Sequence, residues 1–222
     1  MKTNTLKFNI SEIFYSIQGE GTRAGLPCVF IRLQGCNLRC AWCDTSYALE
    51  LNQKEMEMTS DEIISLVQSY NCNFIEFTGG EPLAQSNSVE LINMFARNNY
   101  TVAVETNGYF PLNHLDNKVI KIMDIKCPAS KMNKFNNYDN INFLNKSDEI
   151  KFVVLDKSDF DWALEIIKKY ELVHKVSSIL ISPVYGKLEY KQLAEWILEA
   201  KLPLRMQLQI HKFIWEPNTR GV

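Results

Sequence analysis

The chain has 222 residues, of which 46% are hydrophobic, and it carries a formal net charge of −2 at pH 7. This length and composition favour one domain, residues 1–222, with a substantial hydrophobic core. The charge balance excludes the strongly basic surface typical of nucleic-acid binding. The sequence has no long apolar run of about 18 residues, so no membrane partner is expected.

The cysteine content indicates the cellular compartment. The N-terminus lacks the apolar core of a signal peptide, yet the chain has six cysteines. Cysteines without an export signal favour a reducing compartment, where thiols serve metal or redox chemistry rather than disulfides. We therefore expect a cytoplasmic protein in which Cys28, Cys72 and Cys127 are small buried hydrophobes.

Strands and helices are expected to alternate along most of the chain. Apolar or alternating runs predict strands at 8–17, 27–34, 73–77, 101–105, 119–124, 149–155, 176–182 and 204–210. Helical spacing predicts one helix after the capping box Thr59-Ser-Asp-Glu62, and others at 88–98, 159–170 and 188–200. The last helix is expected to bury Leu193, Ala194, Ile197 and Leu198. Residues 127–147 contain six asparagines and predict a long polar loop.

This alternation is typical of a parallel sheet. About four helices for roughly seven strands are too few for a closed eight-fold barrel, so the expected fold class is α/β, as a partial, open barrel with a reduced set of helices. Ligands in such sheets gather at the carboxyl ends of the strands. Five loops follow strands and are expected to share one cleft: 36–45, 78–82, 106–108, 124–128 and 182–186.

One short loop carries three cysteines at the spacing C-x3-C-x2-C, namely Cys36, Cys40 and Cys43. Three thiols so close together indicate a common inorganic centre. A structural zinc site usually takes four protein ligands, and the nearest histidine is His114. Iron–sulfur clusters also normally take four thiolates, so three on a four-iron cluster would leave one iron open to another molecule. A zinc site with a distant fourth ligand is the alternative.

With Trp42 before the third cysteine, this loop resembles the cluster loop of the radical S-adenosylmethionine (SAM) superfamily. The resemblance implies a partial barrel of the radical SAM type. It also implies a [4Fe-4S] cluster on the three cysteines, with the fourth iron chelated by SAM. Trp42 and Asp44 are then expected to lie against this cofactor.

The run Thr78-Gly79-Gly80-Glu81-Pro82 follows another strand, and its glycines can expose backbone to a ligand. Together with the cysteine loop it resembles the superfamily's Gly-Gly-Glu element, which binds the methionyl amino group of SAM through Gly79, Gly80 and Glu81. By the same resemblance, two later strand ends are expected to contact the ribose or adenine through Asp124, Lys126, Ser182, Pro183, Val184 and Tyr185. Ordinary strand ends are the alternative there.

The runs 17–21 and 215–222, together with Cys43-Asp44-Thr45, resemble the 7-carboxy-7-deazaguanine synthase family. That family converts 6-carboxy-5,6,7,8-tetrahydropterin to 7-carboxy-7-deazaguanine with loss of ammonia, in queuosine biosynthesis, and uses Mg2+. The resemblance implies that Thr45 binds Mg2+, with a cap of the following turn as the alternative. It also implies that the pterin is contacted by Ile17, Gln18, Gly19, Glu20, Thr78 and His211, with a structural role as the alternative for His211.

Arg32 stands in an otherwise apolar strand, and a buried arginine is rare unless it is paired. A guanidinium matches a carboxylate in two-pronged fashion. We therefore expect Arg32 to hold the substrate carboxylate, with a structural ion pair to Asp44 or Glu20 as the alternative.

The family resemblance further implies a homodimer and a reducing partner such as flavodoxin or ferredoxin. Two other functions stay open. Another radical SAM enzyme, such as a glycyl-radical activase, has the same cysteine spacing but needs a protein partner and no Mg2+. A non-catalytic zinc-binding module would hold no iron at all.

Overall fold

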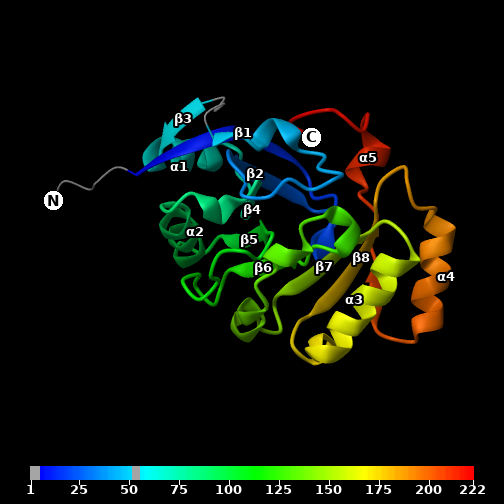
Figure 1. Ribbon diagram of the computed structural model, residues 1–222. Helices are drawn as coiled ribbons and strands as arrows, with labels where there is room; N and C mark the ends of the chain where they lie inside the picture. Colours follow the sequence, from blue (N-terminus) through cyan, green and yellow to red (C-terminus); the bar gives the residue numbers. More distant parts are fainter. Residues whose placement is uncertain (1–5, 52–55) are drawn as a thin grey trace.

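Nine strands form one open sheet in the computed structural model, which describes residues 6–51 and 56–222 (Figure 1). The strand order is β3-β1-β2-β4-β5-β6-β7-β8-β9. β1 pairs antiparallel with β2 and β3, and all later pairs, from β2 with β4 to β8 with β9, are parallel. The strands are β1 Lys7–Ile17, β2 Pro27–Leu33, β3 Met56–Thr59, β4 Phe74–Gly79, β5 Thr101–Thr106, β6 Ile120–Asp124, β7 Glu149–Val154, β8 Ser178–Pro183 and β9 Leu204–Met206.

Helices cover the outer face of this sheet. The longer ones are α1 Ser60–Ser69, α2 Ser88–Arg97, α3 Lys157–Lys169 and α4 Tyr190–Ala200, and a short α5 spans His211–Ile214. The predicted capping box begins α1, because the Thr59 hydroxyl accepts from the Glu62 amide while the Glu62 carboxylate accepts from the Thr59 amide. No α-helix connects β5 to β6 or β6 to β7. The open barrel with few helices is therefore confirmed.

Side chains alternate along each strand, so the two faces of the sheet carry two separate hydrophobic clusters. On β2, Val29, Ile31 and Leu33 pack into the main core beneath the helices, whereas Cys28 and Phe30 belong to a second cluster inside the barrel. That second cluster fills the barrel floor with Phe14, Cys28, Phe30, Phe74, Ala103, Ile120, Ile122 and Leu180. Further along the same strands the inward positions become polar, so a hydrophilic cavity opens at the carboxyl ends.

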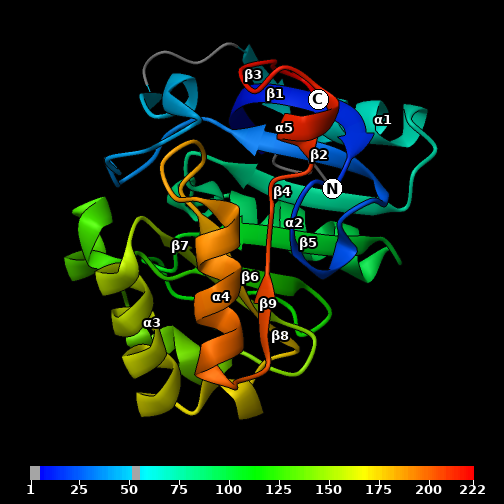
Figure 2. The ribbon, with the colours of Figure 1, turned by 90° about the vertical axis from the view of Figure 1, so that its right-hand side faces the viewer.

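The C-terminal segment lies across the side where the sheet is open (Figure 2). After β9 the chain runs toward β1 and β2, and α5 lies beside them. Gln207 accepts from the Gly21 amide at 2.6 Å, and the Ile210 amide donates to the Gly19 carbonyl at 3.1 Å. Long-range hydrogen bonds thus join the loop after β1 to the segment after β9, without closing the sheet.

Several expected details are wrong. Leu198 is 76% exposed on α4, where Leu193 is the buried residue. The last strand ends at Met206 instead of 210, and the edge strand β3 was not expected. Lys121 in β6 is buried, with its Nζ 3.2 Å from the Asp148 carboxylate. Cys28 and Cys127 are buried as expected, whereas Cys72 is half-buried.

The asparagine-rich segment is more ordered than a polar loop. It contains three 3-10 turns, at Pro128–Ser130, Asn133–Phe135 and Tyr138–Phe143. Asn140 is buried, and its amide nitrogen donates to the carbonyls of Gly108 and Phe110 at 2.8 Å each. Asn140 and Asn137 thus satisfy backbone groups of the neighbouring β5–β6 connection. None of the helices in residues 6–51 and 56–222 is long and apolar enough to cross a membrane.

Candidate active site

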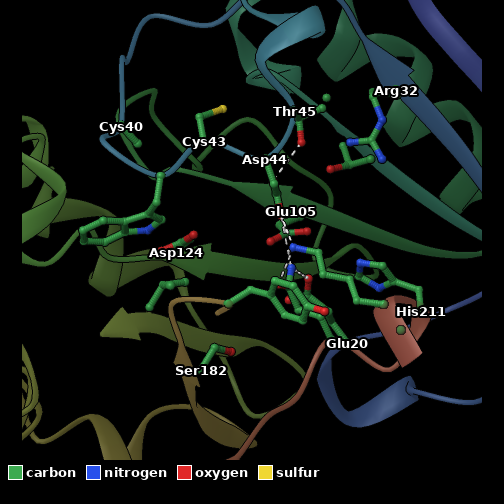
Figure 3. Close-up of a pocket in the computed structure, with 18 of the residues that line it drawn as sticks. Glu20, Arg32, Cys40, Cys43, Asp44, Thr45, Glu105, Asp124, Ser182 and His211 are labelled. Carbon is green, nitrogen blue, oxygen red and sulfur yellow. Dashed lines mark hydrogen bonds and ion pairs between the residues drawn. The ribbon is translucent and has the colours of Figure 1, made fainter. Parts of the chain in front are cut away.

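A cavity of about 740 Å³ lies at the carboxyl ends of the parallel strands (Figure 3). It receives the cysteine loop after β2, the glycines after β4, the ends of β6 and β8, and the residues before α5. All the predicted site residues line it except Glu81, which is fully buried behind it. The expectation that separate loops meet in one cleft is therefore confirmed.

The cysteine loop is held from both sides. The Gly35 and Cys36 amides donate to the carbonyls of Ala48 and Leu49 at 2.8 and 3.0 Å. On the other side, the Ala41 amide donates to the Ser130 carbonyl, in the asparagine-rich segment, at 3.2 Å. These backbone hydrogen bonds hold the loop in place, so that its three cysteine side chains can face the cavity.

All three cysteines are free, half-buried and open to the cavity. Cys36 Sγ accepts from the Leu38 amide at 3.4 Å, an interaction that also suits a cluster thiolate. Among the described residues, no three cysteine, histidine or carboxylate side chains converge on one ion, as a zinc ion would require. Separate thiols around an open space fit an iron–sulfur cluster, in which each iron takes its own thiolate.

The glycines after β4 lie directly against this loop. A Cβ on Gly80 would come within 2.5 Å of the Gly35 carbonyl oxygen and 2.8 Å of Cys36 Cβ. Gly79 has φ +144°, and a Cβ there would overlap the Leu33 backbone. Only glycine allows these close approaches, which bring backbone carbonyls to the edge of the cysteine loop.

Glu81 points away from the cavity. Its carboxylate accepts from the Leu83 and Asn107 amides at 3.0 and 2.7 Å and from the Thr106 hydroxyl at 2.8 Å. Burial raises the pKa of Glu81 to about 7, although these hydrogen bonds oppose the effect. Glu81 therefore ties the loop after β4 to the end of β5.

The far wall of the cavity comes from β6 and β8. Asp124 Oδ2 accepts from Lys126 Nζ at 2.7 Å, whereas its buried Oδ1 has no hydrogen-bond partner in the described part of the chain. Buried acceptors are rarely left without a donor, and Asp124 lines the cavity, so its carboxylate fits a hydrogen-bond donor from a ligand. Ser182 accepts from Gln207 at 3.1 Å, and Pro183 and Val184 are buried beside it.

Arg32 and Asp44 form ion pairs that the sequence analysis did not predict. Arg32 pairs with Glu12 through Nε at 2.7 Å, and not with Asp44 or Glu20. Asp44 pairs with Lys212 at 2.9 Å and also accepts from the Thr45 hydroxyl at 3.0 Å. Burial alone would raise the pKa of Asp44, but the charge and hydrogen bond of Lys212, together with the Lys151 charge, hold that pKa below the usual range.

The predicted pterin contacts form a compact loop after β1. Gln18 is buried, donating to Glu76 and accepting from the Glu20 amide at 2.9 Å. His211 packs against Gly19, where any Cβ would overlap the imidazole. Burial lowers the pKa of His211, and the Glu20 charge only partly opposes this, so the ring is neutral at pH 7.

Sequence reasoning missed three charged groups inside the barrel, on the cavity wall. Glu76, Glu105 and Lys151 all line the cavity (Glu105 is labelled in Figure 3). Burial raises the pKa of Glu76 well above its ordinary value, and the charge of Glu105 adds to this. The available signal was a charged residue inside each of the apolar runs 74–77, 101–105 and 149–154, on the inward-facing alternation.

Comparisons with known proteins identify the family. The Radical SAM superfamily model matches residues 30–197. The 7-carboxy-7-deazaguanine synthase of Chlorobaculum tepidum is 45% identical over 217 residues, covering 96% of this chain and 97% of that protein. The synthase of Koribacter versatilis is 41% identical over 227 residues, covering 96% and 99%.

A solved structure supports the fold. The crystal structure of QueE from Escherichia coli has a TM-score of 0.74 at 24% identity, over 90% of this chain and 94% of that one. The matched regions include the cysteine loop and the strands that surround the cavity. The chain therefore belongs to the radical SAM superfamily and, within it, to the 7-carboxy-7-deazaguanine synthase family.

Proposed function

We propose that this protein converts 6-carboxy-5,6,7,8-tetrahydropterin to 7-carboxy-7-deazaguanine with loss of ammonia, a ring contraction in queuosine biosynthesis. One observation carries the proposal: the cysteine loop, the glycines after β4 and the loop 17–20 all open into a single cavity. The relatives that match nearly the whole chain bear the name of this synthase.

The cofactor half of the cavity fits a cluster with SAM. Cys36, Cys40 and Cys43 would hold the [4Fe-4S] cluster, with SAM on its fourth iron. When bound and reduced, this pair supplies a 5′-deoxyadenosyl radical that abstracts hydrogen from the substrate. Because Glu81 is fully buried and does not line the cavity, the carbonyls of the preceding glycines would accept from the methionyl ammonium. The unsatisfied Oδ1 of Asp124 would accept from a ribose hydroxyl.

Other residues of that half would flank the adenosyl group. Lys126 would keep Asp124 fixed through their ion pair at 2.7 Å. The remaining predicted contacts are Trp42, Asp44, Ser182, Pro183, Val184 and Tyr185, all of which line the cavity.

The opposite half of the cavity suits the pterin. Burial alone would raise the pKa of Glu20, but the Lys151 charge, together with the hydrogen bonds from Lys151 and Gln209, holds that pKa below its ordinary value. An ionised Glu20 would accept from the adjacent N–H donors of the pterin edge. Arg32 bonds to Glu12 through Nε, so its two terminal nitrogens form the edge that a substrate carboxylate would meet. Ile17, Gln18, Gly19, Thr78 and His211 would complete the pocket.

Thr45 is our proposed protein ligand for Mg2+. Mg2+ usually takes few protein oxygens and completes its shell with substrate and water. The Thr45 hydroxyl lines the cavity and has the Asp44 carboxylate as its neighbour at 3.0 Å, a sparse set of hard oxygen donors. Thr45 would hold the ion at this side of the cavity, and a bound Mg2+ would supply positive charge for the substrate carboxylate.

Partners and compartment follow from the same proposal. The cluster needs a one-electron donor, such as flavodoxin or ferredoxin. The homodimer rests on the family resemblance alone. Free cysteines at every described position support a reducing, cytoplasmic location.

The direct test is anaerobic turnover of the carboxypterin with reductant, SAM and Mg2+. We expect the deazaguanine product and free ammonia. A protein that retains its cluster and cleaves SAM but forms no deazaguanine would end the substrate assignment and leave the superfamily intact.

The same preparation separates the other functions. A glycyl-radical activase would act without Mg2+ on a protein and would bind no pterin. A zinc module would be colourless and contain one zinc ion without sulfide, whereas the proposed enzyme is brown after anaerobic purification.

A further inference from the structure

The cavity wall inside the barrel contains a lysine that sequence reasoning did not single out. Lys151 lies on β7, its side chain is 7% exposed, and Nζ lies 2.5 Å from Glu20 Oε2 and 2.6 Å from Glu105 Oε1. Glu20 comes from the loop after β1 and Glu105 from the end of β5. One ammonium group on β7 therefore joins carboxylates that belong to two other parts of the fold.

The surroundings of this group are strongly acidic. Burial alone would lower the pKa of Lys151, but the charges of Glu105 and Glu20 outweigh it and hold the pKa well above the ordinary lysine value. The ionisable groups that act on Lys151 from the neighbouring elements are Glu20, Asp44, Glu76, Glu105, Asp124, Lys126 and His211. Two cations thus face several carboxylates, and Lys151 is the one that contacts Glu20 directly.

Two neutral donors also hold the Glu20 side chain. Gln207 and Gln209 donate to its two oxygens at 2.7 and 2.8 Å. These amides orient the carboxylate but add no charge. Among the groups that lower the pKa of Glu20, Lys151 acts most strongly, through its charge and its hydrogen bond, and the Gln209 hydrogen bond adds to this.

We propose that Lys151 is a positioning residue for the pterin, acting through Glu20 and Glu105. The inference rests on the proposed function and deepens it. Lys151 keeps Glu20 charged and places it at the cavity wall, so that the carboxylate can accept from the N–H donors of a pterin edge. A neutral Glu20 would present a proton to those donors and bind the edge poorly.

The test is Lys151→Met, with cluster content and SAM binding measured beside pterin affinity. We expect the pterin Kd to rise at least about tenfold, because an unpaired buried carboxylate takes up a proton. SAM binding and the electron paramagnetic resonance signal of the SAM-bound cluster should stay as in the wild type. The pterin affinity of the variant should recover as pH rises, whereas the wild-type affinity should stay flat over the same range.

Lys121 provides a matched control. It is also a fully buried lysine, but it pairs with Asp148 at 3.2 Å and does not line the cavity. Lys121→Met should lose stability and leave the pterin Kd unchanged. If Lys151→Met does not fold, the double variant Lys151→Met with Glu105→Gln removes one buried charge of each sign and should show the same weakened, pH-dependent binding.

The outcomes separate the two proposals. Absence of pterin binding and product in the wild type would remove the proposed function. A wild type that turns over the pterin, with Lys151→Met or the double variant within twofold of it at every pH, would overturn the role of Lys151 alone. An equal rise of the pterin Kd in Lys121→Met would do the same, because the effect would then be loss of stability.

Discussion

The carboxylate of Glu81 accepts a hydrogen bond from the backbone amide of Asn107 at 2.7 Å. The two residues follow β4 and β5, which are neighbours in the sheet. The bond fixes the glycine loop relative to the cysteine loop, because Asn107 also donates to Asn37 at 2.9 Å. A residue outside the cavity thus determines how two parts of the cofactor site face one another.

This buried carboxyl predicts a pH dependence of stability. The ordinary glutamate pKa of 4.5 rises to about 7 in the folded protein, so the folded state binds the proton more tightly. Stability from this group is present below pH 4.5 and is lost as pH rises through about 7, by an amount on the order of 3 kcal/mol. Chemical denaturation of the apoprotein at a series of pH values measures it.

In Glu81→Gln this part of the pH dependence should disappear, since the amide does not titrate. The exposed Glu165 serves as the control, and Glu165→Gln should keep the wild-type slope. An unchanged slope in Glu81→Gln would show that the pKa of Glu81 is ordinary.

Gly80→Ala should impair cluster assembly. The new Cβ would meet the carbonyl oxygens of Gly35 and Ala48 at 2.5 and 2.6 Å, and the loop would have to move at a cost of about 1–3 kcal/mol. Iron and sulfide content after anaerobic reconstitution provides the measurement. Gly25→Ala is the control, because Gly25 also has positive φ but nothing lies within 4 Å of the added carbon; equal iron contents would refute the clash.

Asp124→Ala should weaken SAM binding. The buried Oδ1 lacks a partner among the described residues, and a ribose hydroxyl would provide one. Hydrogen bonds to charged groups contribute about 1.5–3 kcal/mol, so Kd should rise roughly tenfold to a hundredfold. Calorimetric titration of the cluster-loaded protein measures it. Asp161→Ala, at an exposed carboxylate on α3, should bind SAM normally; if Asp124→Ala also binds normally, the ribose contact is wrong.

Thr45→Ala should raise the Mg2+ concentration needed for half-maximal activity. Loss of one ion–oxygen contact would raise it by a factor on the order of ten, which corresponds to about 1.4 kcal/mol. Initial rates over a Mg2+ series measure it. Thr45→Ser keeps the hydroxyl and should stay close to the wild type. Equal Mg2+ requirements in both variants would exclude Thr45 as a ligand.

Arg32→Lys should raise KM for the pterin with little effect on SAM. A lysine keeps the charge but loses the two-pronged contact, so KM should increase about tenfold or more. Steady-state kinetics with saturating SAM measures it. Arg97→Lys alters an exposed arginine paired with Asp116 and should leave KM unchanged. A KM in Arg32→Lys that matches this control would leave Arg32 as a structural partner of Glu12.

The sequence by itself determined the parts that depend on local pattern. Neighbouring residues alone define the cysteine spacing, the capping box of α1 and the alternation of strands and helices. The structure contains all three features. Residues at the carboxyl ends of parallel strands must share one edge of the sheet, so the meeting of the cysteine loop with 78–82 and 182–186 was predictable as well.

Tertiary structure alone decided which charges meet. Arg32 with Glu12, Asp44 with Lys212, and Lys151 with Glu20 and Glu105 are pairs whose members lie on different elements. Spacing in the chain carries no information about such pairs, because the curvature of the sheet and the path of the C-terminal segment place them. The same holds for the direction of the Glu81 side chain, which depends on the end of β5 and not on its own motif.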